Sequence, residues 1–525
     1  MTVFLKRTAA LLLSFSFLFL PSCANGTPEG TSPPDGATEP IPASFWEDNE
    51  HFTESEGAIM QKDNDFSALL FSREEHPKDF FLSFTASFDA RSVLGLYFDG
   101  VKTEDGGFSS ALLLRIDAKN GRVSLYSEQN GGQTLLASHD AVFGKEASVL
   151  LTAQSTAISV YCTGGEKDPA ETGPLINVRC ARAAERYLAL SCYGSSKTAF
   201  CSWTLGEYAA PEGDLYRNPL LSDAADPTAF YYGGVYYVFS TGSFSCRETT
   251  DLIRYRSIGA VADSSKLYGH KYFGGPTLYE KDGIFYMFYT TYKTGSDSEL
   301  LICVATSDKV TGPYAQTKQT TLNETYCAKG SAGAFPFRDP VSGKEYLYWY
   351  TTERAYGNLI YGAEITFDGG VASIDPATIT RLVYPTEAWE KKEENGYSGR
   401  VCERANVIFH NGYYYLFYAG SHFATSYGEG YAVSKSPLGP FTKYKNNPIL
   451  SATSLVNGPG CTFIVPSPDG TELFVLYHAH QSTSKVNPRP LYLDRLEFRP
   501  DPDGGADIAC ICGPTVTYQP VPSAK

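Results

Sequence analysis

The sequence has little methionine and less positive than negative charge. The first observation bears on the fold class and the second on the kind of partner that the protein binds. It has 3 methionines among 525 residues, against 37 tyrosines and 32 phenylalanines. Aromatic and β-branched residues fit the half-buried pleated surface of a sheet, so the composition predicts β structure. Lysine and arginine number 43 against 58 acidic residues, which gives a net charge of -15. No basic patch is visible, which argues against nucleic-acid binding and leaves a neutral partner.

Long apolar runs are absent after the first twenty residues, so no later segment is long enough to cross a bilayer. At the start, Lys6 and Arg7 precede an apolar run from Ala9 to Leu20, which is the order of a secretory signal over residues 1–23. The run ends in LPSC, which resembles a bacterial lipoprotein processing site, so Cys23 is the expected lipidation residue. The alternative is an ordinary signal peptide with an incidental cysteine. Both interpretations predict export, and the first predicts a lipid anchor at the bacterial cell surface.

Residues 24–43 contain almost nothing that could fill a core, which predicts a flexible linker. The remaining length, roughly 480 residues, is too great for one ordinary core, so two or more domains are expected. The 12 cysteines are compatible with disulfides in an exported protein. Their spacing matches no zinc pattern, since Cys510 and Cys512 are too close together and the other cysteines lack a histidine cluster.

Residues 45–208 carry short strand-like segments separated by Gly, Asn and Asp turns, without helical periodicity. This pattern indicates an antiparallel β-sandwich of the jelly-roll type. The order of its segments resembles the concanavalin-like and laminin-G-like domains. Two roles stay open for it: a carbohydrate-binding accessory module, or a packing domain that braces its neighbour.

Five segments within residues 215–520 share one shape, a turn containing glycine followed by an aromatic-rich strand. They recur at intervals of roughly 50 to 70 residues, the length of a four-stranded propeller blade with its loops. The sequence therefore predicts an all-β protein in which a five-bladed β-propeller follows the sandwich. Inner strands of a propeller converge on a central funnel, so the chemistry is expected at their starts. The markers of the five turns are Gly234, Gly283, Gly343, Gly412 and Gly470.

Two carboxylates stand just before such strands, Asp226 ahead of the first and Glu403 ahead of the fourth. With the motifs around them, this part of the chain resembles the family 43 glycoside hydrolases, which are five-bladed propellers. The resemblance implies hydrolysis of a glycosidic bond with inversion, in which Asp226 is the general base on water and Glu403 the general acid. The matching motifs are Asn218-Pro219-Leu220, Ala225-Asp226-Pro227, Gly275-Pro276-Thr277, Ser436 to Phe441, Tyr477 to His480 and Asp494-Arg495-Leu496.

The sequence departs from the family where a third Asp orients the acid, because that position falls at Ala332 or Gly333. Asp339 is the candidate replacement, since Arg338-Asp339-Pro340 is similar to the Arg-Asp-Pro motif of related fructan-active hydrolases. The alternative for Asp339 is an ordinary turn residue.

The resemblance also implies substrate binding by Arg489 and His478, with a solvated loop arginine as the alternative for Arg489. Many relatives hold an ion with a histidine in the central channel, and Cys461 stands in its place here. A buried free cysteine behaves as a small hydrophobe, so neither a metal nor another cofactor is predicted.

The leading functional hypothesis is an inverting hydrolase that acts on α-L-arabinofuranosyl or β-D-xylosyl groups of plant polysaccharide or oligosaccharide, as a monomer. A second hypothesis is a propeller that binds glycans without cleaving them, because the third acid is missing. A third is a fructan-active hydrolase, which Asp339 would favour.

Overall fold

The structure, a computed structural model, describes residues 43–524 except 56–57, 63–67, 90, 142, 155, 165–173, 194–197, 209–213, 243, 317, 323–329, 454 and 502–503. The predicted signal, its lipidation residue Cys23 and nearly all of the predicted linker lie outside these residues. The described elements are β-strands and short 3-10 turns, which confirms the all-β prediction. Among the described residues, no helix is long and apolar enough to span a membrane. The 3-10 turns are η1 (Ala43–Phe45), η3 (Ser264–Lys266), η4 (Pro376–Thr378) and η5 (Ala388–Lys391).

The N-terminal part consists of a seven-stranded and a six-stranded antiparallel sheet, with orders β1-β2-β13-β4-β9-β10-β11 and β3-β12-β5-β6-β7-β8. Their strands are β1 (Phe52–Ser55), β2 (Ala58–Gln61), β3 (Leu70–Phe71), β4 (Phe80–Ser87), β5 (Val93–Lys102), β6 (Phe108–Asp117), β7 (Arg122–Gln129), β8 (Gly132–Asp140), β9 (Glu146–Gln154), β10 (Ala157–Gly164), β11 (Ile176–Arg179), β12 (Tyr187–Tyr193) and β13 (Ala199–Glu207).

The two sheets share one hydrophobic core, which follows from the alternation along their strands. In β4, Phe80, Leu82 and Phe84 point to one face and are buried together with Leu96 and Phe98 of β5. Side chains of a strand alternate between its faces, so every second residue of β4 reaches the same core. The core therefore lies between the seven-stranded and the six-stranded sheet.

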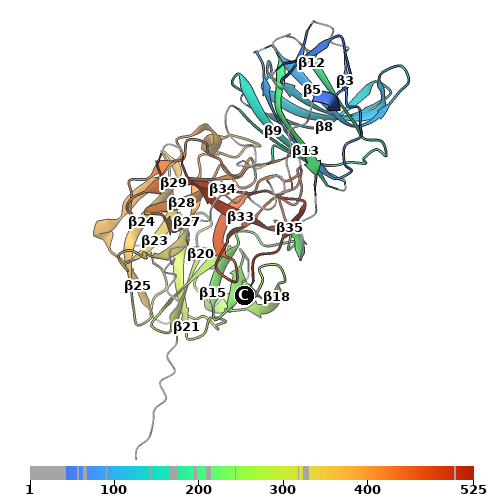
Figure 1. The fold of residues 1–525 in the computed structure, drawn as a ribbon. Helices are drawn as coiled ribbons and strands as arrows, with labels where there is room; N and C mark the ends of the chain where they lie inside the picture. The colour runs from blue at the N-terminus through green and yellow to red at the C-terminus, as the bar shows by residue number, and fades with distance from the viewer. Residues whose placement is uncertain are drawn as a thin grey trace, which may run out of the picture.

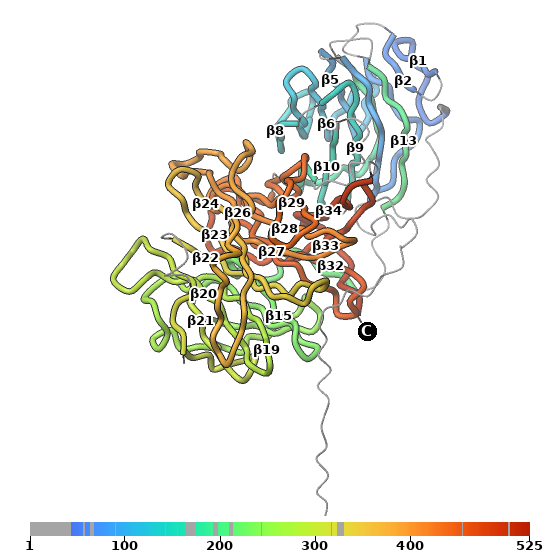
Figure 2. The backbone as a smooth tube through the Cα atoms, turned by 90° about the vertical axis from the view of Figure 1, so that its left-hand side faces the viewer, coloured from blue at the N-terminus to red at the C-terminus, as the bar shows by residue number. Residues whose placement is uncertain are grey.

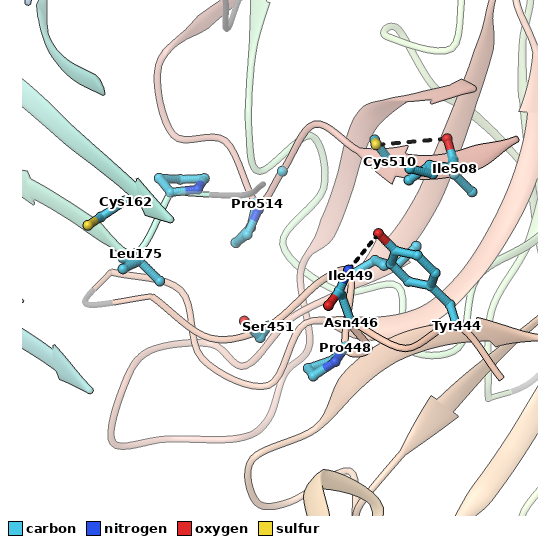
Figure 3. Close-up of a pocket in the computed structure, with 13 residues that line it drawn as sticks. Cys162, Leu175, Tyr444, Asn446, Pro448, Ile449, Ser451, Ile508, Cys510 and Pro514 are labelled. Carbon is cyan, nitrogen blue, oxygen red and sulfur yellow. Dashed lines mark hydrogen bonds between the residues drawn. The ribbon is translucent and has the colours of Figure 1, made fainter. Parts of the chain in front are cut away.

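The N-terminal part rests against the remainder of the chain (Figures 1 and 2), and Cys162 of β10 lines one pocket together with Ile508 and Cys510 of β34. Asn177 and Arg179 donate hydrogen bonds to the carbonyl oxygens of Pro514 and Val516, at 3.3 and 3.2 Å. The pocket lies at this contact, between Cys162 and Leu175 on one side and Tyr444 to Ile449 on the other (Figure 3). Neither Asp226 nor Glu403 lines it.

Residues 228–511 form five successive antiparallel sheets, here called sheets 1 to 5. Sheet 1 holds β15 (Thr228–Tyr232), β16 (Val235–Phe239), β17 (Ser245–Thr249) and β18 (Arg256–Ala260). Sheet 2 holds β19 (Gly274–Lys281), β20 (Ile284–Tyr292) and β21 (Leu300–Ser307). Sheet 3 holds β22 (Ser331–Arg338), β23 (Glu345–Glu353), β24 (Gly357–Asp368), β25 (Val371–Ile374) and β26 (Thr380–Val383). Sheet 4 holds β27 (Cys402–His410), β28 (Tyr413–Gly420), β29 (Gly428–Ser434) and β30 (Thr442–Lys443). Sheet 5 holds β31 (Gly460–Pro466), β32 (Leu473–His478), β33 (Leu491–Arg499) and β34 (Ile508–Ile511).

The predicted glycine turns join the first and second strands of these five sheets. At Gly283, for example, φ is +80°, and at Gly412 it is also +80°. A residue with a side chain adopts this left-handed conformation only at a cost, which explains the glycine in each turn. The five turn-and-strand segments read from the sequence are thus the central hairpins of sheets 1 to 5.

The five sheets pack on one another in cyclic order. Separate hydrophobic clusters lie between sheets 1 and 2, 2 and 3, 3 and 4, and 4 and 5. A further cluster joins sheet 5 to sheet 1, through residues such as Leu476 and Val238. The first strands β15, β19, β22, β27 and β31 contact one another in the same order. Their starts therefore meet at the centre of the ring of sheets.

The two ends of this region are joined by backbone hydrogen bonds. Strand β14 (Leu215–Arg217) pairs with β35 (Tyr518–Pro520), and Leu221 bridges Leu491 of β33. The segment that leads to Asp226 is therefore fixed to sheet 5 before sheet 1 begins.

Candidate active site

Backbone irregularities at the inner ends of the first strands aim side chains at the centre. The register of β22, β27 and β31 shifts just after Ala332, Glu403 and Gly460. A β-bulge bends its strand and redirects a side chain, and it is common beside active sites. The next residues, Gly333, Arg404 and Cys461, have φ of +65°, +58° and +59°. Asp226, just before β15, has φ of +51°.

Asp226 is a buried carboxylate surrounded by cations and donors. Its Oδ1 lies 3.1 Å from Nη1 of Arg489, and its Oδ2 lies 3.3 Å from Nη2 of Arg404. The hydroxyl of Thr241 donates to Oδ2 at 2.6 Å. Burial favours the neutral form, but Arg489 and Arg404 outweigh it and hold the pKa of Asp226 well below its usual range. Asp226 is therefore ionised at neutral pH.

The pKa of Glu403 is shifted in the opposite direction. Tyr427 donates its hydroxyl to Oε1 at 2.9 Å, and Nδ2 of Asn358 donates to Oε2 at 3.2 Å. Burial is the largest influence and raises the pKa of Glu403, with a further contribution from the negative charge of Asp226. Arg404 and the two hydrogen bonds lower it, without reversing the shift. Asp226 and Glu403 thus differ in proton affinity in the direction that a base and an acid require.

Arg404 lies 3.3 Å from the carboxylate of Asp226, and no sequence motif marked it. A Cβ atom at Gly275 would lie 2.7 Å from Nη1 of Arg404, and one at Gly333 would lie 3.3 Å from its Cδ. Glycine at position 275 therefore leaves room for the guanidinium of Arg404 beside Asp226, and Gly333 lies against the same side chain. Gly333 is one of the two positions where a third acid was sought.

Both residues predicted to bind substrate lie at this site. His478 is fully buried, and its Nδ1 accepts the backbone N–H of Asp226 at 3.1 Å. Burial, followed by the charge of Arg489, holds the pKa of His478 well below its usual value, so its ring is neutral. Arg489 is also buried, so it is not a solvated loop arginine. Its guanidinium carbon lies 4.8 Å from the centre of the Phe423 ring.

Asp226, Cys461 and His478 each bring a potential metal-ligand atom to the centre, all within 4.8 Å of one another. The Cys461 thiol is buried, and burial raises its pKa well above the ordinary value. A thiol binds a metal as the thiolate, and two guanidinium groups already contact the carboxylate of Asp226. These charges disfavour a cation at this donor set.

Asp339 is not brought to the site, which corrects its prediction as a third acid. It lies at the other end of β22, in the turn before β23. Its Oδ1 accepts the N–H of Val341 at 3.0 Å and the hydroxyl of Tyr414 at 2.8 Å, and its Oδ2 accepts the N–H of Ser342 at 3.1 Å. A short aspartate side chain often bonds the backbone two residues on, so the turn interpretation holds.

Tyr272, Asn358 and Tyr427 complete the surroundings of the pair, and none was predicted. Tyr272 has φ of +55° and is 39% exposed. Burial of its hydroxyl and the nearby charge of Asp226 raise the pKa of Tyr272 to about 12. Tyr350 is buried beside Arg404 and Gly333. Tyr272 lies in the loop before β19, Asn358 at the start of β24 and Tyr427 just before β29, all outside the segments that the glycine turns marked.

A ring of antiparallel sheets has at its centre an ionised aspartate and a glutamate whose pKa is raised, and such a pair of carboxyl groups is typical of glycoside-cleaving enzymes. The family described as glycosyl hydrolases family 43 matches residues 216–503. The chain therefore belongs to family 43, a family of enzymes that hydrolyse glycosidic bonds.

The chain is similar to two solved structures and to one curated protein. The crystal structure of a thermostable family-43 glycoside hydrolase is similar, with 28% identity and a TM-score of 0.51, over 59% of this chain and all of that one. An endo-1,4-beta-xylanase structure from Bacteroides thetaiotaomicron has 28% identity and a TM-score of 0.48, over 57% of this chain and 98% of that one. A beta-D-galactofuranosidase of Aspergillus niger is 24% identical over 217 residues, which are 41% of this chain and 56% of that protein. The match thus spans about half of that curated relative.

Proposed function

We propose that the protein hydrolyses glycosidic bonds with inversion, with Asp226 as general base and Glu403 as general acid. The observation that carries the proposal is the opposed electrostatics of the pair: cations lower the pKa of Asp226, and burial raises the pKa of Glu403. In an inverting reaction, the base removes a proton from the attacking water while the acid protonates the leaving oxygen. Tyr427 and Asn358 donate to the two oxygens of Glu403, which holds the carboxyl group in one orientation.

We propose two finer features of the fold as well. Residues 215–520 form a five-bladed β-propeller, which the cyclic packing of sheets 1 to 5 supports. Residues 45–208 form a β-sandwich, which the shared core of the two N-terminal sheets supports. The contact of β11 with residues 514–516 favours a bracing role for that sandwich.

The proposed substrate is a terminal or internal pentose residue, α-L-arabinofuranosyl or β-D-xylosyl, in a plant polysaccharide or oligosaccharide. Membership of family 43 supports it. A β-D-galactofuranoside is the second candidate, because the curated relative carries that name. The turn position of Asp339 removes the observation that favoured fructan.

The substrate proposal is tested with purified protein on aryl α-L-arabinofuranoside, β-D-xyloside and β-D-galactofuranoside, together with arabinan, xylan, inulin and levan. Turnover of a pentoside is expected to exceed that of the other substrates. Faster release of galactofuranose would replace the pentose proposal. Binding of an oligosaccharide without release of sugar from any substrate would favour the glycan-binding alternative.

We also propose that the protein is exported and attached to the membrane through a lipid on Cys23, as a monomer. Replacement of Cys23 by alanine is expected to move the protein from the membrane fraction to the soluble fraction of the producing cell. Unchanged membrane association would contradict the anchor.

A further inference from the structure

An exposed tyrosine stands on a rigid support beside the candidate active site. Tyr397 is 47% exposed and closes a two-residue turn through Asn395 and Gly396, whose φ values are +52° and +80°. Backbone hydrogen bonds between Glu394 and Tyr397 hold both sides of this turn. Asn-Gly at positive φ is the most favourable pair for such a tight turn, so Tyr397 is held at a fixed tip.

The tip is anchored to the loop that orients Glu403. Oε2 of Glu394 accepts both the N–H of Ser426, at 3.2 Å, and its hydroxyl, at 2.6 Å. Tyr427 is the next residue and donates its hydroxyl to Glu403. Ser426 and Tyr427 therefore link the tip to the acid.

The ring of Tyr397 stacks on His422, with 4.3 Å between ring centres and 16° between planes. Burial lowers the pKa of His422, so its ring is uncharged at neutral pH. His422 contacts Phe423 at 4.6 Å, and Phe423 lies against Arg489, the partner of Asp226. Two ring contacts and one guanidinium–ring contact thus connect the exposed tyrosine to Arg489, which pairs with the general base.

We propose that Tyr397 and His422 form a sugar-binding platform for the leaving-group part of an oligosaccharide chain. Sugar rings have an apolar face of C–H groups that packs on aromatic rings, and an aromatic side chain with few rotatable bonds provides that surface at a small entropic cost. The platform belongs to the leaving-group side because its loop also positions Glu403, which protonates the leaving oxygen. The inference rests on the proposed hydrolytic function.

The test compares wild type, Tyr397→Ala and Tyr397→Phe on two substrates with the same cleaved sugar, one a glycosyl fluoride and one an oligosaccharide. Tyr397→Ala is expected to lower kcat/KM about tenfold on the oligosaccharide, since stacked aromatic contacts contribute on this scale. It is expected to leave the glycosyl fluoride unchanged, because a fluoride leaving group is too small to reach the platform. Tyr397→Phe keeps the ring and is expected to match wild type. The control is Tyr232→Ala, because Tyr232 is equally exposed at 47% but lies at the outer turn of sheet 1.

Equal rates for Tyr397→Ala and wild type on the oligosaccharide would overturn the platform, and so would a parallel loss on both substrates. If wild type cleaves neither substrate, the hydrolytic proposal fails separately. Calorimetric binding of the oligosaccharide then tests the platform alone: weaker binding by Tyr397→Ala supports it, and unchanged binding overturns it.

Discussion

Replacement of Glu403 by glutamine removes the proposed acid and leaves most of its surroundings intact. The amide oxygen still accepts the hydroxyl of Tyr427, but the amide nitrogen faces Nδ2 of Asn358, which is also a donor. A flip of the Asn358 amide relieves this mismatch, because the hydroxyl of Thr352, which donates to Oδ1 at 2.8 Å, can also accept from Nδ2. We therefore expect the free energy of unfolding to fall by less than about 1 kcal/mol.

The loss of activity is expected to be much larger than the loss of stability, and to depend on the leaving group. General acid catalysis contributes about 10²- to 10⁴-fold, or about 3 to 5 kcal/mol of barrier, so turnover of a natural glycosidic bond should fall by that factor. An aryl glycoside with a strongly acidic phenol leaves without protonation, so its rate should fall less than about tenfold. Initial rates over a series of phenols measure the difference. The control is Glu345→Gln. Glu345 is the first residue of β23, at the end of that strand away from the centre of the ring, and it pairs with Lys281. Equal losses with good and poor leaving groups would refute the acid role of Glu403.

Three further predictions concern the centre of the ring. Arg404→Met removes a cation that favours the charged form of both carboxyls, so the pKa values of Asp226 and Glu403 both rise. In the pH profile of kcat/KM, the acid limb moves to higher pH because the base is protonated sooner. The alkaline limb also moves to higher pH because the acid keeps its proton longer. Arg404→Lys should restore part of the profile, and limbs that stay in place in Arg404→Met would contradict this coupling. Gly333→Ala is expected to destabilise the protein by more than about 1 to 2 kcal/mol in chemical denaturation, because φ is +65° and the new Cβ would lie 2.9 Å from Tyr350. The control is Gly343→Ala, where φ is +73° but no atom lies near the new Cβ, so only the strain of the left-handed backbone is expected. Equal destabilisation by Gly333→Ala and Gly343→Ala would contradict a clash with Tyr350. Asp226→Asn is expected to lower kcat by at least about 10²-fold on every substrate, aryl glycosides included, since attack by water still needs a base.

The repeating features of the fold could be predicted from the sequence because each is a local pattern. Gly283 and Gly412 mark their hairpins, since a positive φ at a tight turn selects glycine whatever surrounds it. Aromatic residues between such turns predicted the strands for a similar local reason. The contact between sheet 5 and sheet 1 joins residues far apart in the chain, such as Val238 and Leu476. No local pattern predicted this contact, and the number of repeats was its only indication in the sequence.

The candidate site was predictable only in part. Asp226 and Glu403 stand at the starts of repeated strands, and the register of the repeat was enough to find them. Arg404 was missed because its role depends on a bulge in β27 and on the space left by two glycines in other sheets. Asp339 was wrongly predicted at the site because its Asp-Pro motif is a local feature of the sequence. Its distance from Glu403 depends instead on the end of β22 that it follows, which is the outer end.

The most direct test of the account is the configuration of the sugar when it is first released. Proton NMR during early turnover of the accepted glycoside distinguishes the two anomers before they interconvert in water. The account predicts that the first product has the configuration opposite to that of the substrate, because Asp226 activates a water molecule and does not itself attack the sugar. A first product with the configuration of the substrate would contradict it, since retention requires a carboxylate that bonds covalently to the sugar.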